Sequence, residues 1–92
     1  MIKTFKSKPL ADLWHIGKSA KIDARMHNRI LIRLDRLNTA TRLQELILPG
    51  FDFHALKGFN PTRYTIHVNG PWCITFEFKN GDSYRLDFEQ YH

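Results

Sequence analysis

Residues 64–88 read YTIHVNGPWCITFEFKNGDSYRLDF, and hydrophobic side chains occupy every second position in three runs of this stretch. The hydrophobic positions are Tyr64, Ile66, Val68, Trp72, Ile74, Phe76, Phe78, Tyr84, Leu86 and Phe88. A two-residue period is typical of β-strands that bury one face. The stretch therefore predicts three consecutive strands of an antiparallel sheet.

The register of these strands follows from the parity of the hydrophobic positions. All of them carry even numbers, so they share one face only if the strands are joined by three-residue loops at residues 69–71 and 80–82. This register predicts two cross-strand pairs, Glu77 with Arg85 and His67 with Cys73. Opposite charges in the first pair support the register, because like charges there would destabilise the sheet. The other face is then polar and carries Thr65, His67, Cys73, Thr75, Glu77, Arg85 and Asp87.

The first half of the chain has the end signals and the spacing of helices. Ser7 is expected to cap a helix that Gly17 ends, and Asp23 is expected to begin a longer main helix. Hydrophobic residues recur at helical spacing along the main helix, at Met26, Ile30, Leu34 and Leu37. The opposite, solvated side is predicted to carry Arg25, Arg29, Arg33 and Arg36.

Two shorter elements flank these helices. Residues 2–5 are predicted to form an opening strand, and Thr41 with Gln44 has the spacing of a capping box for a short helix that ends at residues 49–50. Helices followed by a run of antiparallel strands are typical of the α+β class. We therefore expect a single α+β domain over residues 1–92, with helices packed on one face of a small antiparallel sheet.

Composition narrows the class of protein. A chain of 92 residues has room for one domain, and its 42% hydrophobic and 25% charged residues are ordinary globular values. The single Cys73 excludes a disulfide framework, and His15, His27 and His67 have no partner at a metal-ligand spacing. No apolar run reaches the ~18 residues of a membrane span, and no signal-peptide core is present. We expect a cytoplasmic protein that uses no metal, cofactor or membrane.

Positive charge is concentrated in the helical half. The whole chain carries +5, whereas the part up to residue 42 has ten basic and three acidic residues, a local charge of +7. Such a basic region favours a polyanionic partner such as RNA, because neutralising phosphates provides affinity independent of sequence. The alternative is that these side chains only solvate helix faces.

Four polar residues lie at loop edges or at the chain end, outside the periodic stripes: His54, Lys57, Tyr91 and His92. Cleavage of RNA through its own 2′-hydroxyl needs a base for that hydroxyl, an acid for the departing 5′ oxygen and cations around the phosphate. Two histidines and a lysine match that need, although each residue also has an ordinary structural explanation. A nucleophilic pair of Cys73 and His67 is a further possibility, but no orienting third group is recognisable.

Six short segments match one known family in order and spacing: residues 1–5, 37–41, 56–58, 72–76, 80–82 and 91–92. On these segments the chain resembles the HigB toxins of the RelE-like superfamily over essentially its whole length. The resemblance implies a type II toxin that enters the A site of the 70S ribosome, contacts 16S rRNA and cuts mRNA there without a metal. It also implies a helix-turn-helix antitoxin of the HigA type as partner.

The resemblance also assigns residues. Its active-site positions fall on His54, Lys57, Cys73, Gln90, Tyr91 and His92. It implies that the two histidines divide the acid and base roles, that Lys57 stabilises phosphate charge and that Tyr91 positions the nucleotide or assists proton transfer. The residues expected to contact RNA or the ribosome are Lys3, Lys6, Lys8, Lys18, Lys21, Arg25, Arg29, Arg33, Arg36, Arg63 and Asn69.

Two active-site positions depart from the family pattern. Family members commonly have arginine at position 73 and an acidic residue at position 90, where this chain has Cys73 and Gln90. Loss of one such phosphate contact typically lowers a rate by ~10²–10³. Three explanations stay open: a toxin attenuated by an Arg→Cys change, a variant in which Arg63, His67 or Arg85 supplies the charge, or a protein that binds antitoxin without cleaving. The alternative function is a non-catalytic module that binds RNA or antitoxin.

Overall fold

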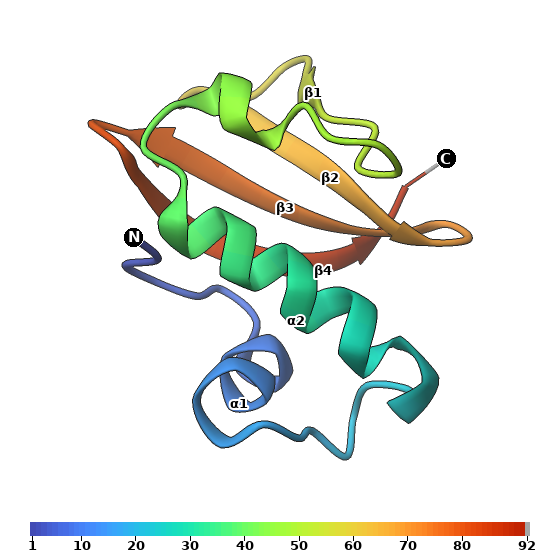
Figure 1. Ribbon diagram of the computed structural model, residues 1–92. Coiled ribbons are helices and arrows are strands. Elements are labelled where there is room, and N and C mark those ends of the chain that lie inside the picture. The colour runs from blue at the N-terminus through green and yellow to red at the C-terminus, as the bar shows by residue number, and fades with distance from the viewer. Residues whose placement is uncertain (92) are drawn as a thin grey trace.

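The computed structural model describes residues 1–91 and contains one antiparallel sheet covered by helices (Figure 1). In chain order the elements are α1 (Lys8–Ile16), α2 (Ala24–Thr39), the 3-10 turn η1 (Leu43–Leu46), β1 (His54–Leu56), β2 (Arg63–Asn69), β3 (Trp72–Lys79) and β4 (Asp82–Gln90). The strands lie in the order β1-β2-β3-β4, and every neighbouring pair is antiparallel. The predicted α+β class is therefore confirmed.

The ends of both helices follow the predicted signals. Ser7 accepts a hydrogen bond from the backbone N–H of Leu10 at 3.1 Å, and Gly17 ends α1 with a left-handed φ of 91°. Asp23 Oδ1 accepts from the backbone N–H of Arg25 at 2.9 Å and begins α2. The Arg25 side chain also donates to Asp23, and these hydrogen bonds lower the pKa of the carboxyl to about 2.

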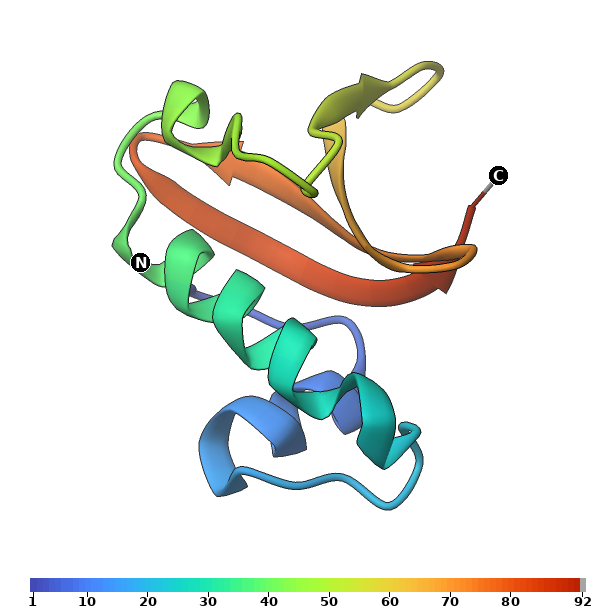
Figure 2. The same ribbon diagram turned by 45° about the vertical axis from the view of Figure 1, so that its right-hand side comes forward.

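The core lies between α2 and the sheet. The predicted stripe of α2 is buried, as are five even-numbered strand residues, Ile66, Val68, Ile74, Phe76 and Leu86. The segment between α2 and β1 adds Leu46 and Phe51 to the same cluster. Figure 2 shows the curvature of the sheet, with α2 running along one side of it. Because successive strand residues point to opposite faces, the odd-numbered residues of β2 lie on the face turned away from α2.

The first hairpin confirms one predicted pair and corrects the loop. His67 pairs with Cys73 as predicted, but Asn69 pairs with Trp72, which leaves a loop of two residues at 70–71 instead of three. A register shift between His67 and Asn69 takes up the extra residue. The irregularity therefore lies within β2 and not in the turn.

The second hairpin shows the same correction. Its loop has two residues, 80–81, and a register shift lies between Thr75 and Glu77 on β3. Glu77 consequently pairs with Tyr84 and not with Arg85, which adopts a φ of 51° at the bulge. The prediction that Tyr84 points to the core is wrong, since Ser83 occupies the buried position. The predicted ion pair still forms, with Arg85 Nε 3.3 Å from Glu77 Oε2.

The prediction that Arg33 lies on the solvated side of α2 is wrong. Its side chain is buried, and its guanidinium lies 4.8 Å from the centroid of the Phe51 ring. Its Nε donates to the backbone oxygen of His67 at 2.5 Å. Burial, followed by repulsion from Arg29, lowers the pKa of this guanidinium. Arg33 thus connects α2 to β2.

Two smaller predictions need correction. The predicted opening strand makes only isolated parallel bridges to β4, at Ile2 and Phe5. At η1, the capping residue is Glu45 and not Gln44, because the Glu45 carboxylate accepts from the backbone N–H groups of Thr41 and Arg42 at 2.8 and 3.0 Å. Those two bonds lower the pKa of Glu45. Within residues 1–91, no helix combines the length and hydropathy required to cross a bilayer.

Candidate functional site

A cleft of about 490 Å³ brings together three of the residues predicted for the active site. It is lined by Asp52, His54, Leu56, Thr65, His67, Gly70, Pro71, Cys73 and Tyr91. These residues come from β1, β2, the first hairpin turn, β3 and the segment after β4. The predicted His54, Cys73 and Tyr91 therefore meet across the sheet, although almost twenty residues separate each from the next.

His54 is held by the turn that precedes β1. Asp52 has a left-handed φ of 44°, and its backbone oxygen lies 2.8 Å from Nδ1 of His54. A carbonyl oxygen only accepts, so Nδ1 must donate its hydrogen in this contact. The neutral imidazole then has its lone pair on Nε2. An exposed histidine with a free Nε2 is suited to take a proton from a bound hydroxyl.

The end of β4 brings Tyr91 to the first hairpin turn. Gln90 pairs with Trp72, and the backbone N–H of Tyr91 donates to the backbone oxygen of Pro71 at 2.6 Å. This bond continues the pairing beyond β4 and fixes Tyr91 at the rim of the cleft. The predicted catalytic residue His92 lies outside the described residues, so its position relative to His54 stays a prediction.

Cys73 lies at the centre of the cleft wall. It is 7% exposed, and its direct partners are His67 on β2 and Glu89 on β4. Its sulfur is 4.0 Å from the backbone oxygen of Pro71, a distance compatible with a weak S–H donor. Among the described residues that line the cleft there is no lysine or arginine. In this described lining, the side chains that can become cations are therefore His54 and His67.

Three residues predicted for the site lie outside the lining of this cleft, and one of them, Gln90, is exposed at the end of β4. Lys57 follows β1 and is exposed, and Asn69 is exposed at the tip of the first hairpin. Asn69 instead lines a neighbouring hollow together with Arg25 and the Trp72 side chain. All three residues are accessible to solvent, and their roles stay predictions.

Arg63 is engaged inside the protein. It is 8% exposed, and it donates to Glu77 Oε2 at 3.1 Å, to the Thr75 hydroxyl at 3.0 Å and to the backbone oxygen of Arg85 at 2.9 Å. These contacts satisfy its guanidinium away from the cleft. The basic residues that do remain exposed up to residue 42 are Lys3, Lys6, Lys8, Lys18, Lys21, Arg25, Arg29, Arg36 and Arg42.

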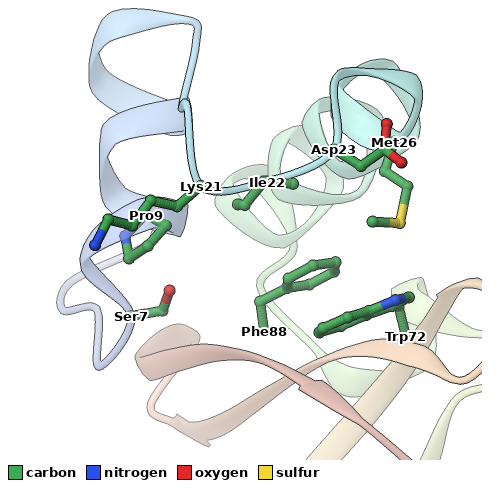
Figure 3. A pocket seen from close by; sticks show the side chains of 8 residues that line it. All are labelled: Ser7, Pro9, Lys21, Ile22, Asp23, Met26, Trp72 and Phe88. Atoms are coloured by element: carbon green, nitrogen blue, oxygen red, sulfur yellow. The ribbon is translucent and has the colours of Figure 1, made fainter.

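A second cleft, of about 370 Å³, lies between the helices and the sheet (Figure 3). Trp72 and Phe88 stack there with their ring centroids 4.7 Å apart, and Met26 of α2 faces them. The titratable side chains in its lining are Lys21 and Asp23. This lining is mainly apolar and has no histidine among residues 1–91, so the chemistry of RNA cleavage fits the first cleft better.

Comparison with known proteins identifies the family of the chain. The model of the HigB-like toxins, described as the RelE-like toxin of the type II toxin-antitoxin system HigB, matches residues 3–92. The chain belongs to this family. A similar protein is the endoribonuclease HigB of Proteus vulgaris, which is 41% identical over 92 residues and is covered over its full length, as is this chain. The predicted membership of the HigB toxins is confirmed, and a type II toxin has an antitoxin as its partner.

In this HigB-like toxin the structure adds Thr65 to the residues foreseen in the cleft, and it places there His67, one of the three residues considered as a source of the charge missing at position 73. The predicted register placed both on the polar face, and it placed His67 opposite Cys73, which was the available signal. What the sequence did not reveal is that β1 pairs His54 with Thr65 and so brings that face beside His54. Within residues 1–91 no group of three or more histidine, cysteine, aspartate or glutamate side chains is arranged to hold a metal ion.

Proposed function

We propose that this HigB-like toxin is an endoribonuclease that cleaves mRNA in the ribosomal A site and so stops translation. The observation that carries the proposal is His54, whose Nδ1 donates to the Asp52 backbone oxygen at 2.8 Å and leaves Nε2 free at an open cleft. The full-length similarity to a protein named endoribonuclease HigB supports the same chemistry.

In the proposed mechanism, His54 is the base. Its Nε2 takes the proton of the 2′-hydroxyl, whose oxygen attacks the adjacent phosphorus. The bond from phosphorus to the 5′ oxygen breaks, and His92 donates a proton to that oxygen as it leaves. The products are a 2′,3′-cyclic phosphate and a free 5′-hydroxyl, so the two histidines exchange protonation states and no net charge is created. Tyr91 positions the nucleotide, and Lys57 stabilises phosphate charge from outside the cleft.

The proposed partners are inferred from the exposed basic residues of the helical half and from the open form of the cleft. The exposed lysines and arginines of the helical half would contact 16S rRNA in the 70S ribosome, since these side chains are accessible to solvent. In an open cleft with few catalytic groups, the reaction rate increases most when a larger assembly holds the substrate in place. A HigA-type antitoxin with a helix-turn-helix would neutralise the toxin, and the site of action would be the cytoplasm.

The test is cleavage of a defined mRNA on purified 70S ribosomes. His54→Ala and His92→Ala are each expected to lower the single-turnover rate by ~10²–10⁴, the usual contribution of a general acid or base. His15→Ala is the matched control, because His15 is an exposed histidine of α1 distant from the cleft lining. Unchanged cleavage after replacement of both catalytic histidines would overturn the mechanism. Ribosome binding with intact mRNA in the unaltered protein would instead favour a non-catalytic binding module.

A further inference from the structure

The cleft has few groups that can hold a phosphate. No lysine or arginine appears among its described lining residues, and Asp52 contributes a negative charge. A phosphodiester that is being cleaved gains negative charge on its non-bridging oxygens, and hydrogen-bond donors aimed at those oxygens give the largest single contribution to such reactions. Apart from His54, the side-chain donors in the lining are Thr65, His67, the Cys73 thiol and Tyr91.

His67 is held rigidly at the side of this cleft. Its backbone N–H donates to the Phe51 oxygen at 2.6 Å, and its backbone oxygen accepts from Arg33 Nε at 2.5 Å. Its ring Nε2 lies 2.9 Å from the backbone oxygen of Gly70, so Nε2 donates its hydrogen there. The remaining nitrogen, Nδ1, carries a second N–H when the ring is protonated. The imidazolium then has one N–H fixed by Gly70 and a second N–H to offer to an anion.

Thr65 provides a second, independent observation. Its side chain lines the cleft, is 1% exposed, and its hydroxyl has no hydrogen-bond partner among the described residues. A buried hydroxyl without a partner is costly, and a ligand oxygen would satisfy it. Thr65 is also the direct partner of His54 on β1 and lies two residues before His67 on β2. His54, Thr65 and His67 therefore follow one another along the same face.

We propose that the His67 imidazolium and the Thr65 hydroxyl bind the non-bridging oxygens of the scissile phosphate. This rests on the proposed function and adds a third histidine to the site, as a cation within a described lining that has no lysine or arginine. The charged and titratable groups that face His67 are Asp52, His54, Cys73 and Tyr91 across the cleft, Glu89 beside Cys73, and Arg33 at its backbone. Activity that depends on His67 is expected to fall as pH rises and the imidazolium loses its proton.

Cys73 offers a direct test, because it is the cross-strand partner of His67. An arginine at position 73 would place a permanent guanidinium next to the same phosphate position. Cys73→Arg is therefore expected to make His67 dispensable. In the unaltered background, His67→Gln should lower single-turnover cleavage by ~10²-fold and Thr65→Val by ~10-fold, in the range of single transition-state donors. In the Cys73→Arg background, His67→Gln should change the rate by less than ~5-fold, on the same reasoning that one cation replaces another.

The controls separate this role from a structural one. The pH–rate profile of the unaltered protein should decline at high pH more steeply than that of Cys73→Arg, a difference that a purely structural His67 would not produce. Thermal unfolding of each variant checks the fold, and His15→Gln serves as the matched exposed-histidine control. An equal loss from His67→Gln in both backgrounds, or no loss in either, would overturn the proposal.

A binding measurement keeps the proposal independent of catalysis. In an NMR titration with inorganic phosphate, the ring resonances of His67 should shift more than those of His15, and Thr65→Val should weaken that response. If ribosomes yield no cut mRNA but this response is present, the proposed cleavage fails while the anion site stands. If the His67 resonances do not respond to phosphate, the anion site fails whatever the cleavage result.

Discussion

Arg33→Met tests whether a buried arginine without a carboxylate partner stabilises this fold. Arg33 crosses from α2 to β2, where its Nε donates to the backbone oxygen of His67 at 2.5 Å. No salt bridge to Arg33 is found within residues 1–91, so its energy comes from carbonyl groups and from the Phe51 ring. Methionine preserves a long apolar side chain and removes those contacts.

The magnitude follows from the contacts. A hydrogen bond from a charged donor contributes ~1.5–3 kcal/mol, and a cation above an aromatic ring adds ~0.5–1 kcal/mol. The further bonds to the backbone oxygens of Arg29 and Gly50, at 3.1 and 3.4 Å, add little, because Gly50 is exposed to water and the Arg29 carbonyl belongs to the helix. Burying methionine does not require the removal of water from a charged group, and this offsets part of the lost stability. We expect a decrease of ~2–3 kcal/mol in unfolding free energy, or roughly 10–20 °C in Tm.

Urea unfolding followed by circular dichroism measures this change. Arg36→Met is the matched control, because Arg36 lies on the same helix and is exposed, and it should change the unfolding free energy by less than ~0.5 kcal/mol. Arg33→Lys should lie between the unaltered protein and Arg33→Met, since an ammonium keeps the charge but loses the planar fork. A loss below ~1 kcal/mol for Arg33→Met, or one equal to the Arg36→Met control, would refute the reasoning.

Two further predictions concern an end of a helix and a turn. The pKa of Asp23 is about 2 because Arg25 donates to it from its side chain and backbone. The ionised carboxylate therefore stabilises the fold fully at pH values above 3.8, the ordinary pKa of this group. This stabilisation is lost as the pH falls toward 2. Asp23→Asn keeps the helix cap but removes the titratable group. The unfolding free energy of this variant should therefore fall less steeply between pH 5 and pH 2 than that of the unaltered protein. Equal slopes of unfolding free energy against pH in the two proteins would count against this account. Gly81→Ala should lower the unfolding free energy by ~1–2 kcal/mol, since Gly81 has a φ of 82° and an added Cβ would lie 3.4 Å from the Thr41 backbone oxygen. Gly58→Ala, with a φ of 85° and open space around it, isolates the cost of backbone conformation and should lose less in the same urea titration; an equal loss would exclude a role for the Thr41 contact.

The elements that sequence predicted well are those with a long repeat. The stripe of α2 repeats over twelve residues and the strand stripes over five to seven, so single errors do not alter the period. The caps at Ser7 and Asp23 were also predictable, because a side-chain oxygen next to a free backbone N–H is a local interaction. The buried stripe of α2 and the five buried even-numbered strand residues followed from these two periods.

The turns were mispredicted for a reason that is general to hairpins. A two-residue turn followed by a one-residue bulge consumes the same number of residues as a three-residue turn. Beyond the bulge both arrangements give the same pairs, such as His67 with Cys73 and Thr75 with Asp87. The parity of hydrophobic residues cannot tell them apart. The difference shows only next to the turn, where Tyr84 and Ser83 exchange faces.

The candidate site was foreseeable in its residue types and not in its electrostatics. Counting charges along the chain treats every arginine as available, but Arg33 is bound to carbonyl oxygens and Arg63 to Glu77 and Thr75. Both arginines are buried because a long side chain can reach from one element to hydrogen-bond acceptors on a neighbouring one. The position of those acceptors depends on the tertiary structure, and no local sequence pattern predicts it. With these two cations taken up by the fold and no lysine or arginine among the described residues of the cleft lining, the proposed phosphate site relies on His67, which is a cation only when it is protonated. That dependence is the reason to expect the cleavage rate of this chain to be more sensitive to pH than that of its Cys73→Arg variant.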